Sequence, residues 1–486
     1  MNHPTIKQLT HLALAITLLA TSAVYAQDKP KPFAQPQPQP QPLGDAAQFG
    51  ANIQRTMTLL ATSTPRKRNR VRILFYGQSV TRGAWWKSVA ADLRERFPHA
   101  DLEIKNRAVG GYGGPVLINT AEYDLYPFYP DLVIFHVWSG VESGHQEEII
   151  RRIRQRTTAE VLLWTSNLRW PIWSVPPDGD PQHADVRYIE AQDQAISDLY
   201  FRLGKKFHCE VADVRSGMKT YLAKHKLLVK DTIADSVHPN KFGNFLISEL
   251  VKPHLRYNAK FDDSKWKDLV TDIPLDDPRV RRAADGSLSL DFSGNRIDVI
   301  AAADAKDTTA AVLIDGKRPS QNPRLYYHAR PTLAPGAGRP AINRIDHKTP
   351  LQVETWTARI LECDLKNDVL RYEIIGSKTG PDGSGDHKKR FVSNSGRVII
   401  EPGMWMLNWS LRYCKLKLPQ DFKVTWQTLP LFLDTWKAPT DIDPTRESVA
   451  TLAQGLKNSK HTLTLKPQGG NALGVKAFRV YQPPRQ

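Results

Sequence analysis

The feature that most constrains the fold of this chain is an alternation of two patterns between residues 71 and 257. Short, nearly continuous apolar runs rich in valine, isoleucine and leucine occur at 71–76, 132–137 and 161–165. Runs of this kind are typical of parallel strands that are covered on both faces. The segments between them carry apolar residues at helical spacing, and one of these segments stops at Gly204. The alternation predicts an α/β domain with a mainly parallel sheet.

Polar or glycine-rich turns follow the predicted strands, at the end of an open α/β sheet where ligands bind. These turns hold Ser79 after the first strand, Gly110 and Gly111 after a second near 102–104, Ser139 and Gly140 after the third, and Asn167 after the fourth. Because the strands are expected to be parallel, all four turns should lie along one rim of the sheet.

After about residue 262 the sequence changes to period-two alternation with turn signals. The alternating runs lie at 287–292, 296–299, 311–314, 369–375, 397–400, 424–427, 461–465 and 475–481. Asp315 and Gly316 follow one of them as a hairpin signal. This pattern predicts an all-β sandwich with an inserted region between Pro319 and Thr440.

The first 26 residues have the pattern of a signal peptide, with Lys7, an apolar core at 12–19 and a cleavage site after Ala26. No later run reaches the ~20 apolar residues that cross a bilayer, so we expect an exported protein, secreted or periplasmic, without an integral membrane segment after processing. A proline- and glutamine-rich spacer follows at 30–42. The expected parts are a signal peptide (1–26), a linker and lead-in (27–65), the α/β domain (66–260) and the β-sandwich (261–486).

The formal net charge of +17 favours acidic partners. Export and the lack of aromatic side chains among the basic clusters argue against nucleic acid, which leaves ordinary solvated faces or an anionic glycan as interpretations. Three cysteines are too few for a disulfide scaffold, although export permits one bridge, which we expect between Cys363 and Cys414. The sequence leaves the oligomeric state open.

Two segments that lie far apart in the sequence carry a serine, a histidine and a carboxylate. Residues 77–83 read Gly-Gln-Ser-Val-Thr-Arg-Gly and contain Ser79, and residues 235–240 read Asp-Ser-Val-His-Pro-Asn and contain Asp235 and His238. A serine hydroxyl is a weak nucleophile unless an imidazole accepts its proton and a third group orients that imidazole. Taken singly, Ser79 is as well explained as a helix cap and His238 as a surface residue. Taken together, they predict a catalytic site.

These segments resemble the SGNH, or GDSL-like, hydrolase family over residues 71–255. Segment 235–238 reproduces the Asp-x-x-His of that family, whereas the first segment has Gln78 where the family has aspartate. The resemblance implies a three-layer α/β/α domain in which Ser79 is the nucleophile, His238 the general base and Asp235 the group that orients it. The C-terminal part is similar to the galactose-binding-like jelly-roll modules of carbohydrate esterases.

The resemblance also implies which groups bind the oxyanion. By register, Gly111 supplies a backbone N–H. The third block of the family usually contains an asparagine, which is missing after the third strand here, so Gly140, the Ser139 hydroxyl and the Asn167 amide are the candidate replacements. Loss of one oxyanion donor typically lowers turnover by about 10²–10³, which predicts a slower or rearranged hydrolase and does not require an inactive one.

We therefore expect an exported serine esterase that removes acyl groups, most of all acetyl groups, from a carbohydrate polymer through an acyl-enzyme on Ser79. Two alternatives remain open: a catalytically impaired hydrolase scaffold that serves as a glycan-binding or envelope protein, and a lipid esterase or thioesterase. No cofactor or metal is expected, because the glycine-rich stretch 380–387 lacks the ligand ladder of a calcium loop and is interpreted as a mobile loop. Trp356, Trp405 and Trp426 are candidates either for stacking on sugars or for the sandwich core.

Overall fold

The computed structural model describes residues 38–138, 142–261, 266–303, 305, 307–332, 339–414, 418, 422–469 and 473–484. The chain divides into Met1–Gln39 and Pro40–Gln486, and all the elements named below belong to the second unit. The predicted signal peptide at 1–26 and most of the spacer lie outside the described residues. Among the described residues, no helix is long and apolar enough to cross a membrane.

The N-terminal part of the second unit contains a five-stranded parallel sheet. Its strands are β1 (Arg70–Gly77), β2 (Asp101–Asn106), β3 (Leu132–His136), β4 (Glu160–Trp164) and β5 (Glu210–Ala212), in the order β2-β1-β3-β4-β5. The first four strands agree with the runs predicted from the sequence. The sequence analysis missed β5, because three residues are too few to show an apolar period.

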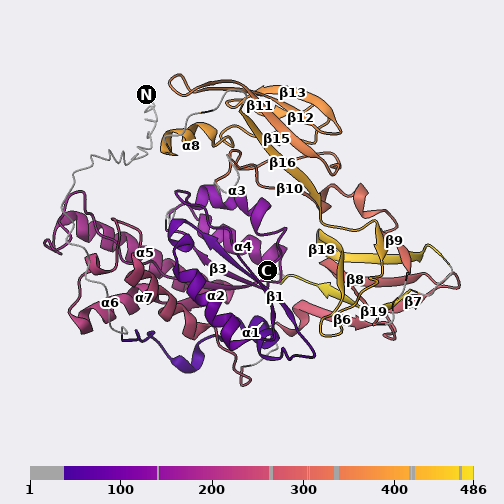
Figure 1. Cartoon of the computed structure of the whole chain (residues 1–486), viewed down its shortest axis with the longest axis horizontal. Helices are drawn as coiled ribbons and strands as arrows, with labels where there is room; N and C mark the ends of the chain where they lie inside the picture. The colour runs from indigo at the N-terminus through magenta and orange to yellow at the C-terminus, as the bar shows by residue number, and fades with distance from the viewer. Residues whose placement is uncertain are drawn as a thin grey trace, which may run out of the picture. The chain divides into compact units, whose positions relative to one another are not determined.

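Helices cover both faces of this sheet, as Figure 1 shows around β1 and β3. The helices on one face are α1 (Gln54–Ala61), α2 (Trp85–Arg96), α6 (Val214–His225) and α7 (Lys241–Val251). Those on the other face are α3 (Gly114–Asp124), α4 (His145–Arg156) and α5 (Ala184–Phe207). Side chains of β1 alternate between the two layers, with Ile73 in one core and Leu74 in the other. The three-layer α/β/α prediction is therefore confirmed.

The α/β domain begins earlier in the chain than the expected boundary at residue 66. Helix α1 buries Met57 and Leu60 in the same core as β1. Its apolar side chains lie on one face over only about two helical turns, which is too short a period to be separated from the preceding linker by sequence pattern alone.

The C-terminal part is all-β apart from short helical segments, as predicted. One antiparallel sheet contains β6 (Val270–Pro274), β7 (Val280–Arg282), β8 (Leu288–Ala301), β9 (Thr309–Ile314), β17 (Thr435–Lys437), β18 (Val449–Pro467) and β19 (Val475–Tyr481). Strands β8 and β18 pair over most of their length, with register shifts that include one between Gln454 and Ser459. The runs predicted at 287–292 and 296–299 are thus two halves of one long, bulged strand.

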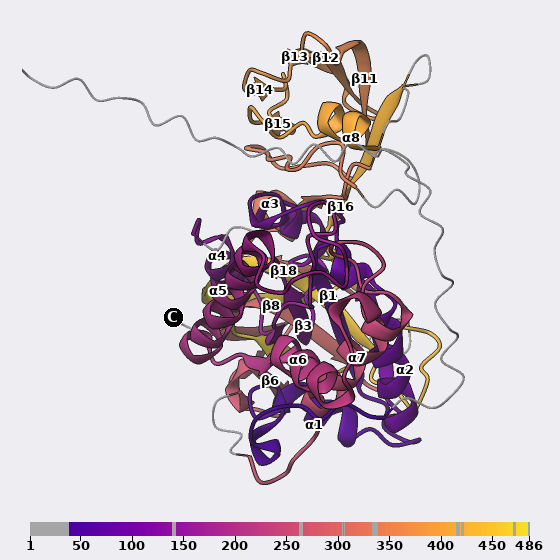
Figure 2. The same cartoon turned by 90° about the vertical axis from the view of Figure 1, so that its left-hand side faces the viewer.

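A second antiparallel sheet lies between β9 and β17 in the sequence, inside the interval where an insertion is predicted. It contains β10 (Tyr326–His328), β11 (Thr355–Asp364), β12 (Val369–Gly376), β13 (Gly380–Asp386) and β16 (Lys423–Pro430). The pair β14 (Phe391–Val392) and β15 (Ile399–Ile400) and the helix α8 (Leu407–Cys414) accompany it, as Figure 2 shows. The expectation of a mobile loop at 380–387 is wrong, because residues 380–386 form strand β13, which pairs with β12.

Of the two interpretations of Trp356, Trp405 and Trp426, the structure supports the core, because all three are buried in the core of the inserted sheet. The disulfide expected between Cys363 and Cys414 is not formed. Cys363 is a free thiol whose sulfur lies 3.5 Å from the Asn408 side-chain oxygen.

Side chains of the α/β domain bond directly to both β-sheet regions. Tyr129 donates a hydrogen bond to the side chain of Asn295 at 2.7 Å, and Asn295 donates to the Arg156 carbonyl at 2.8 Å. Arg330, just after β10, forms a buried ion pair with Asp124. The Arg330–Asp124 pair fixes the inserted sheet against the end of α3, and the Asn295 bonds fix the sheet that contains β8.

The end of β1 requires glycine at position 77. Gly77 has φ of 155°, and a Cβ built there would lie 2.2 Å from the His136 carbonyl oxygen. We expect Gly77→Ala to lower the free energy of unfolding by about 3 kcal/mol or more, because β1 and β3 would have to separate. Gly380→Ala is the matched control: its φ is 79° with no atom within 4 Å of the new Cβ, so backbone strain alone should cost about 1 kcal/mol. Urea unfolding measures the free energy of unfolding of both variants. Equal losses in the two would contradict the close contact between position 77 and the His136 carbonyl.

Candidate active site

Ser79 lies at the rim of the sheet, immediately after β1. It is the first residue of the 3-10 helix η2 (Ser79–Arg82), which follows the constrained turn at Gly77. The first N–H groups of a helix have no partner within the helix, so the backbone of Ser79 and Val80 presents donors at this point. The local chain therefore places a hydroxyl beside unpaired backbone donors.

His238 reaches Ser79 from a segment 159 residues further along the chain. The Nε2 atom of His238 lies 2.8 Å from the Ser79 hydroxyl oxygen, and Nδ1 lies 2.8 Å from Asp235 Oδ2. The segment ends at Asn240, whose side-chain oxygen caps α7 by accepting from the Gly243 N–H at 2.9 Å. The structure thus brings Ser79, His238 and Asp235 into one hydrogen-bonded series.

Asp235 is held by more than the imidazole. Its Oδ1 accepts hydrogen bonds from the backbone N–H groups of Val237 at 2.8 Å and His238 at 2.7 Å. Partial burial tends to raise the pKa of this carboxyl, but the two backbone donors and His238 outweigh burial and lower the pKa. Asp235 is therefore kept as a carboxylate that accepts the Nδ1 proton of His238, which leaves Nε2 as the acceptor for the serine proton.

The site is open to solvent. The side chains of His238 and Asp235 are 47% and 50% exposed. A triad this exposed is accessible to a large substrate that lies across the rim, because such a substrate does not have to enter a tunnel.

The glycine turn after β2 lies against the serine. A Cβ built on Gly110 would be 3.5 Å from Ser79 Cβ, and Val109 N–H donates to the Gly77 carbonyl at 2.9 Å. Gly111, the sequence-predicted oxyanion residue, follows with φ of 80° and is exposed. The structure brings this turn to Ser79 and places Gly110 directly beside the serine side chain.

The third predicted turn lies outside the described residues at Ser139 and Gly140, so the structure gives no position for either. The residue before them is described: Trp138 donates its backbone N–H to Gln78 Oε1 at 2.5 Å. Gln78 therefore ties the turn that carries Ser79 to the end of β3. In the sequence Gln78 is recognisable only as a departure from aspartate, because its contact joins residues 60 positions apart.

Asn167 is brought to the site but is not an oxyanion donor, which corrects that expectation. Its buried side-chain amide donates to the Val237 carbonyl at 2.8 Å and to the Leu168 carbonyl at 3.0 Å, so both N–H groups are used. A backbone bond, from Trp170 N–H to the Ser236 carbonyl at 3.1 Å, joins the same two segments. The loop after β4 therefore supports the segment that carries His238.

Asn167→Leu should loosen the segment at 235–238. The substitution leaves the Val237 carbonyl without its donor, and an unsatisfied buried polar group costs about 1–3 kcal/mol. We expect faster hydrogen exchange at the Val237 and His238 amides, whose protons are held by Asp235. Asn119→Leu, at a half-buried position of α3, removes one amide bond to a backbone carbonyl at 3.1 Å and should leave these amides unchanged. Unchanged exchange in Asn167→Leu would contradict the supporting role.

A buried histidine lies beneath the rim. His136, the last residue of β3, is 1% exposed, has its Nδ1 3.0 Å from the Trp164 carbonyl oxygen and packs against that indole ring. Burial lowers the pKa of His136 to about 4. The imidazole is therefore neutral in the folded protein near neutral pH, and it gains a proton more readily in the unfolded chain.

Acid should destabilise the protein partly through His136. Between its ordinary pKa of 6.5 and the folded value of about 4, the unfolded chain binds the extra proton, so the free energy of unfolding falls as pH falls. From about pH 7 to 5 this group contributes a loss of roughly 2 kcal/mol. In His136→Gln this part of the acid-induced loss should disappear, as measured by urea unfolding at both pH values. An identical acid-induced loss of unfolding free energy in His136→Gln would refute the contribution of His136.

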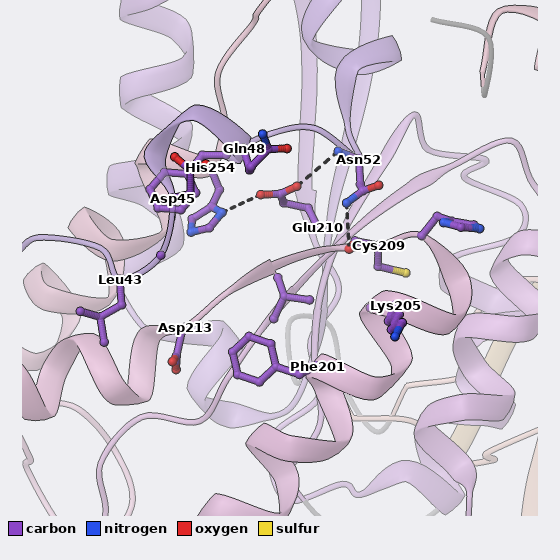
Figure 3. A pocket seen from close by; sticks show the side chains of 15 residues that line it. Leu43, Asp45, Gln48, Asn52, Phe201, Lys205, Cys209, Glu210, Asp213 and His254 are labelled. Carbon is purple, nitrogen blue, oxygen red and sulfur yellow. Dashed lines mark hydrogen bonds and ion pairs between the residues drawn. The ribbon is translucent and has the colours of Figure 1, made fainter. Parts of the chain in front are cut away.

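A separate hollow runs beside the edge strand β5, as Figure 3 shows. It has a volume of about 570 Å³, and Phe201, Lys205 and Cys209 are among its lining residues. Inside it, the Glu210 carboxylate binds His254 at 2.7 Å and the Gly50 N–H at 2.9 Å. These bonds hold the segment before α1 against β5. None of the residues that form them contacts Ser79, His238 or Asp235 in the bonds described above. Among the described residues, no cluster of three His, Cys, Asp or Glu side chains could hold a metal ion.

No family model matches the chain, and no curated protein matches it by sequence. It is similar to the solved structure of a two-domain esterase active on acetylated mannans, with 12% identity, a TM-score of 0.34, and coverage of 91% of this chain and 100% of that one. The acetylxylan esterase Axe2 from Geobacillus stearothermophilus gives 14% identity and a TM-score of 0.32, with 40% and 98% covered. The acetyl xylan esterase AlAXEase gives 19% and 0.31, with 37% and 98% covered. Because these TM-scores are low, the functional conclusion depends on the contacts around Ser79.

Proposed function

We propose that this protein is a serine esterase that removes acyl groups from a carbohydrate polymer. The observation that carries the proposal is the series of two 2.8 Å contacts from Ser79 through His238 to Asp235. This arrangement combines a hydroxyl, a base aimed at it and a carboxylate that fixes the base, which is the requirement for nucleophilic catalysis at neutral pH.

The reaction follows from these positions. His238 Nε2 accepts the Ser79 proton while Oγ attacks the ester carbonyl carbon, and the backbone donors at the start of η2 and at the glycine turn bind the oxyanion. His238 then donates the proton to the departing sugar oxygen, which leaves an acyl group on Ser79. A water, deprotonated by the same nitrogen, releases the acid and restores the hydroxyl.

A polymeric carbohydrate ester is the substrate class that best suits the site. The half-exposed His238 and Asp235 suit a substrate that extends beyond the scissile bond on either side. A lipid ester would instead require a deep apolar groove to cover its chain. A small acyl group such as acetyl needs no such groove, so we propose acetyl esters of a polysaccharide. Export, expected from the first 26 residues, would bring the enzyme to such polymers.

Ser79→Ala should lower kcat for acetyl ester hydrolysis by about 10³-fold or more, because the nucleophile is removed while binding remains. A fluorophosphonate probe should label the wild-type protein on Ser79 and should leave Ser79→Ala unlabelled. Ser320→Ala, in the all-β part of the chain, is the control and should keep full turnover and labelling.

Two results would redirect the proposal. An unlabelled wild-type protein that still binds a polysaccharide would favour a glycan-binding scaffold without catalysis. Labelling together with a preference for long-chain acyl esters or thioesters over acetylated polysaccharide would favour a lipid esterase or thioesterase. Full activity in Ser79→Ala would reject the serine mechanism itself.

A further inference from the structure

An exposed apolar turn lies in the loop that follows β4. Trp173 is 55% exposed, more than any other described tryptophan, and Ile172 beside it is 44% exposed. Moving an indole ring out of water is favourable, so a folded chain usually covers most of such a side chain. Trp173 and Ile172 together form a small apolar surface that is open to a ligand.

Hydrogen bonds close the turn that carries these two side chains. The Val175 N–H donates to the Pro171 carbonyl at 2.9 Å across the turn. Trp170, which is buried, donates its indole N–H to the Val175 carbonyl at 3.2 Å and to the Pro176 carbonyl at 2.9 Å. The backbone under Trp173 is therefore already ordered, so a ligand that binds this ring does not have to order the loop first.

The same loop is bonded to the segment that carries His238. The Trp170 N–H donates to the Ser236 carbonyl at 3.1 Å, and Ser236 lies two residues before His238. Three residues separate Trp173 from Trp170, so the backbone of Trp173 lies within about 11 Å of that bonded residue. The apolar turn is thus held at a distance of a few sugar units from the base of the triad.

A sugar chain that lies across an open rim needs a contact outside the reacting atoms. His238 and Asp235 are half-exposed, so they form no wall against which a polymer could rest. One face of a pyranose ring presents C–H groups, whose partial positive charge complements the negative face of an indole. An aromatic side chain also offers a large, rigid contact area for a small loss of rotamer freedom. An exposed tryptophan on a closed turn is therefore suited to a sugar ring.

We propose that Trp173, with Ile172 beside it, is a subsite for a pyranose ring of the polymer other than the ring that carries the scissile ester. This inference rests on the esterase function proposed above and adds that the substrate is a chain of several sugars. Because stacking uses the C–H face of the ring, the subsite acts on chain length and does not select a particular pattern of hydroxyl groups.

The test measures kcat/KM on acetylated sugars of increasing length, from monosaccharide to octasaccharide, prepared from β-linked xylan and mannan. In the wild-type protein kcat/KM should rise about tenfold or more with length, because a stacked ring contributes about that factor in affinity. In Trp173→Ala the rise should disappear, whereas Trp173→Phe, which keeps an aromatic face, should retain part of it. A rise of the same size in Trp173→Ala, or a wild-type protein without any rise, would overturn the subsite.

Tyr257→Ala is the matched control and should show the wild-type rise with chain length. Tyr257 is 40% exposed and lies beyond the C-terminal end of α7, whereas His238 precedes the N-terminal end of that helix. Trp173→Ala should keep the wild-type urea midpoint, because the side chain that it removes is mostly exposed. A loss of equal size on the monosaccharide and the octasaccharide would overturn the subsite. A loss confined to long-chain acyl esters would assign the turn to the acyl chain and would also overturn it.

Binding measured without turnover separates this inference from the esterase function. Ser79→Ala should bind soluble deacetylated xylan or mannan, and adding Trp173→Ala should weaken that binding about tenfold or more. Hydrolysis of para-nitrophenyl acetate by the wild-type protein without this difference in binding would keep the esterase and reject the subsite. The difference in binding without hydrolysis of any acetyl ester would keep the subsite and reject the esterase.

Discussion

The close packing of β1 against β3 is the constraint on which the rest of the site depends. At Gly77 the two strands approach so closely that a Cβ would meet the His136 carbonyl, so the chain can leave the sheet there only through glycine. The parallel pairing continues to Gly77 and His136, which makes both strands end at the same height. Ser79 is therefore delivered to the rim by backbone packing, and its position does not depend on the flexibility of a long loop.

A set of hydrogen bonds between loops then brings the distant histidine into register. Gln78 joins the turn after β1 to the residue after β3, and Asn167 joins the loop after β4 to the segment that carries His238. Each bond uses a side-chain amide on a backbone group, so each fixes the chain path and leaves the reacting atoms free. The nucleophile and base meet because four strand ends gather at one rim, which is the usual place of ligand sites in open α/β sheets.

The all-β part of the chain contains two sheets. One follows the α/β domain, and the other is inserted between β9 and β17 of the first. The inserted sheet has its own core and is fixed to α3 by the buried pair of Arg330 and Asp124. That anchor is nine residues from Arg339, which bonds to the glycine turn beside Ser79. Ser79, Asp235 and His238 thus belong to the α/β domain, while the insertion brings Arg339 to the glycine turn beside Ser79. This division is common in enzymes, because loops and insertions vary while the supporting sheet is kept.

Sequence patterns alone predict four of the five parallel strands, the all-β character after residue 262, the insertion interval and the trio of Ser79, Asp235 and His238. These features follow from local period and from motifs, both of which are written in consecutive residues. The contacts of Asn167, Gln78, Cys363 and the three candidate tryptophans become visible only in the folded chain. Their roles depend on which distant group each side chain meets: Asn167 contacts a carbonyl 70 residues away, and Trp356 packs into a sheet assembled from five separated strands. Such contacts cannot be predicted from a local sequence pattern, because the packing of whole layers determines which distant residues touch.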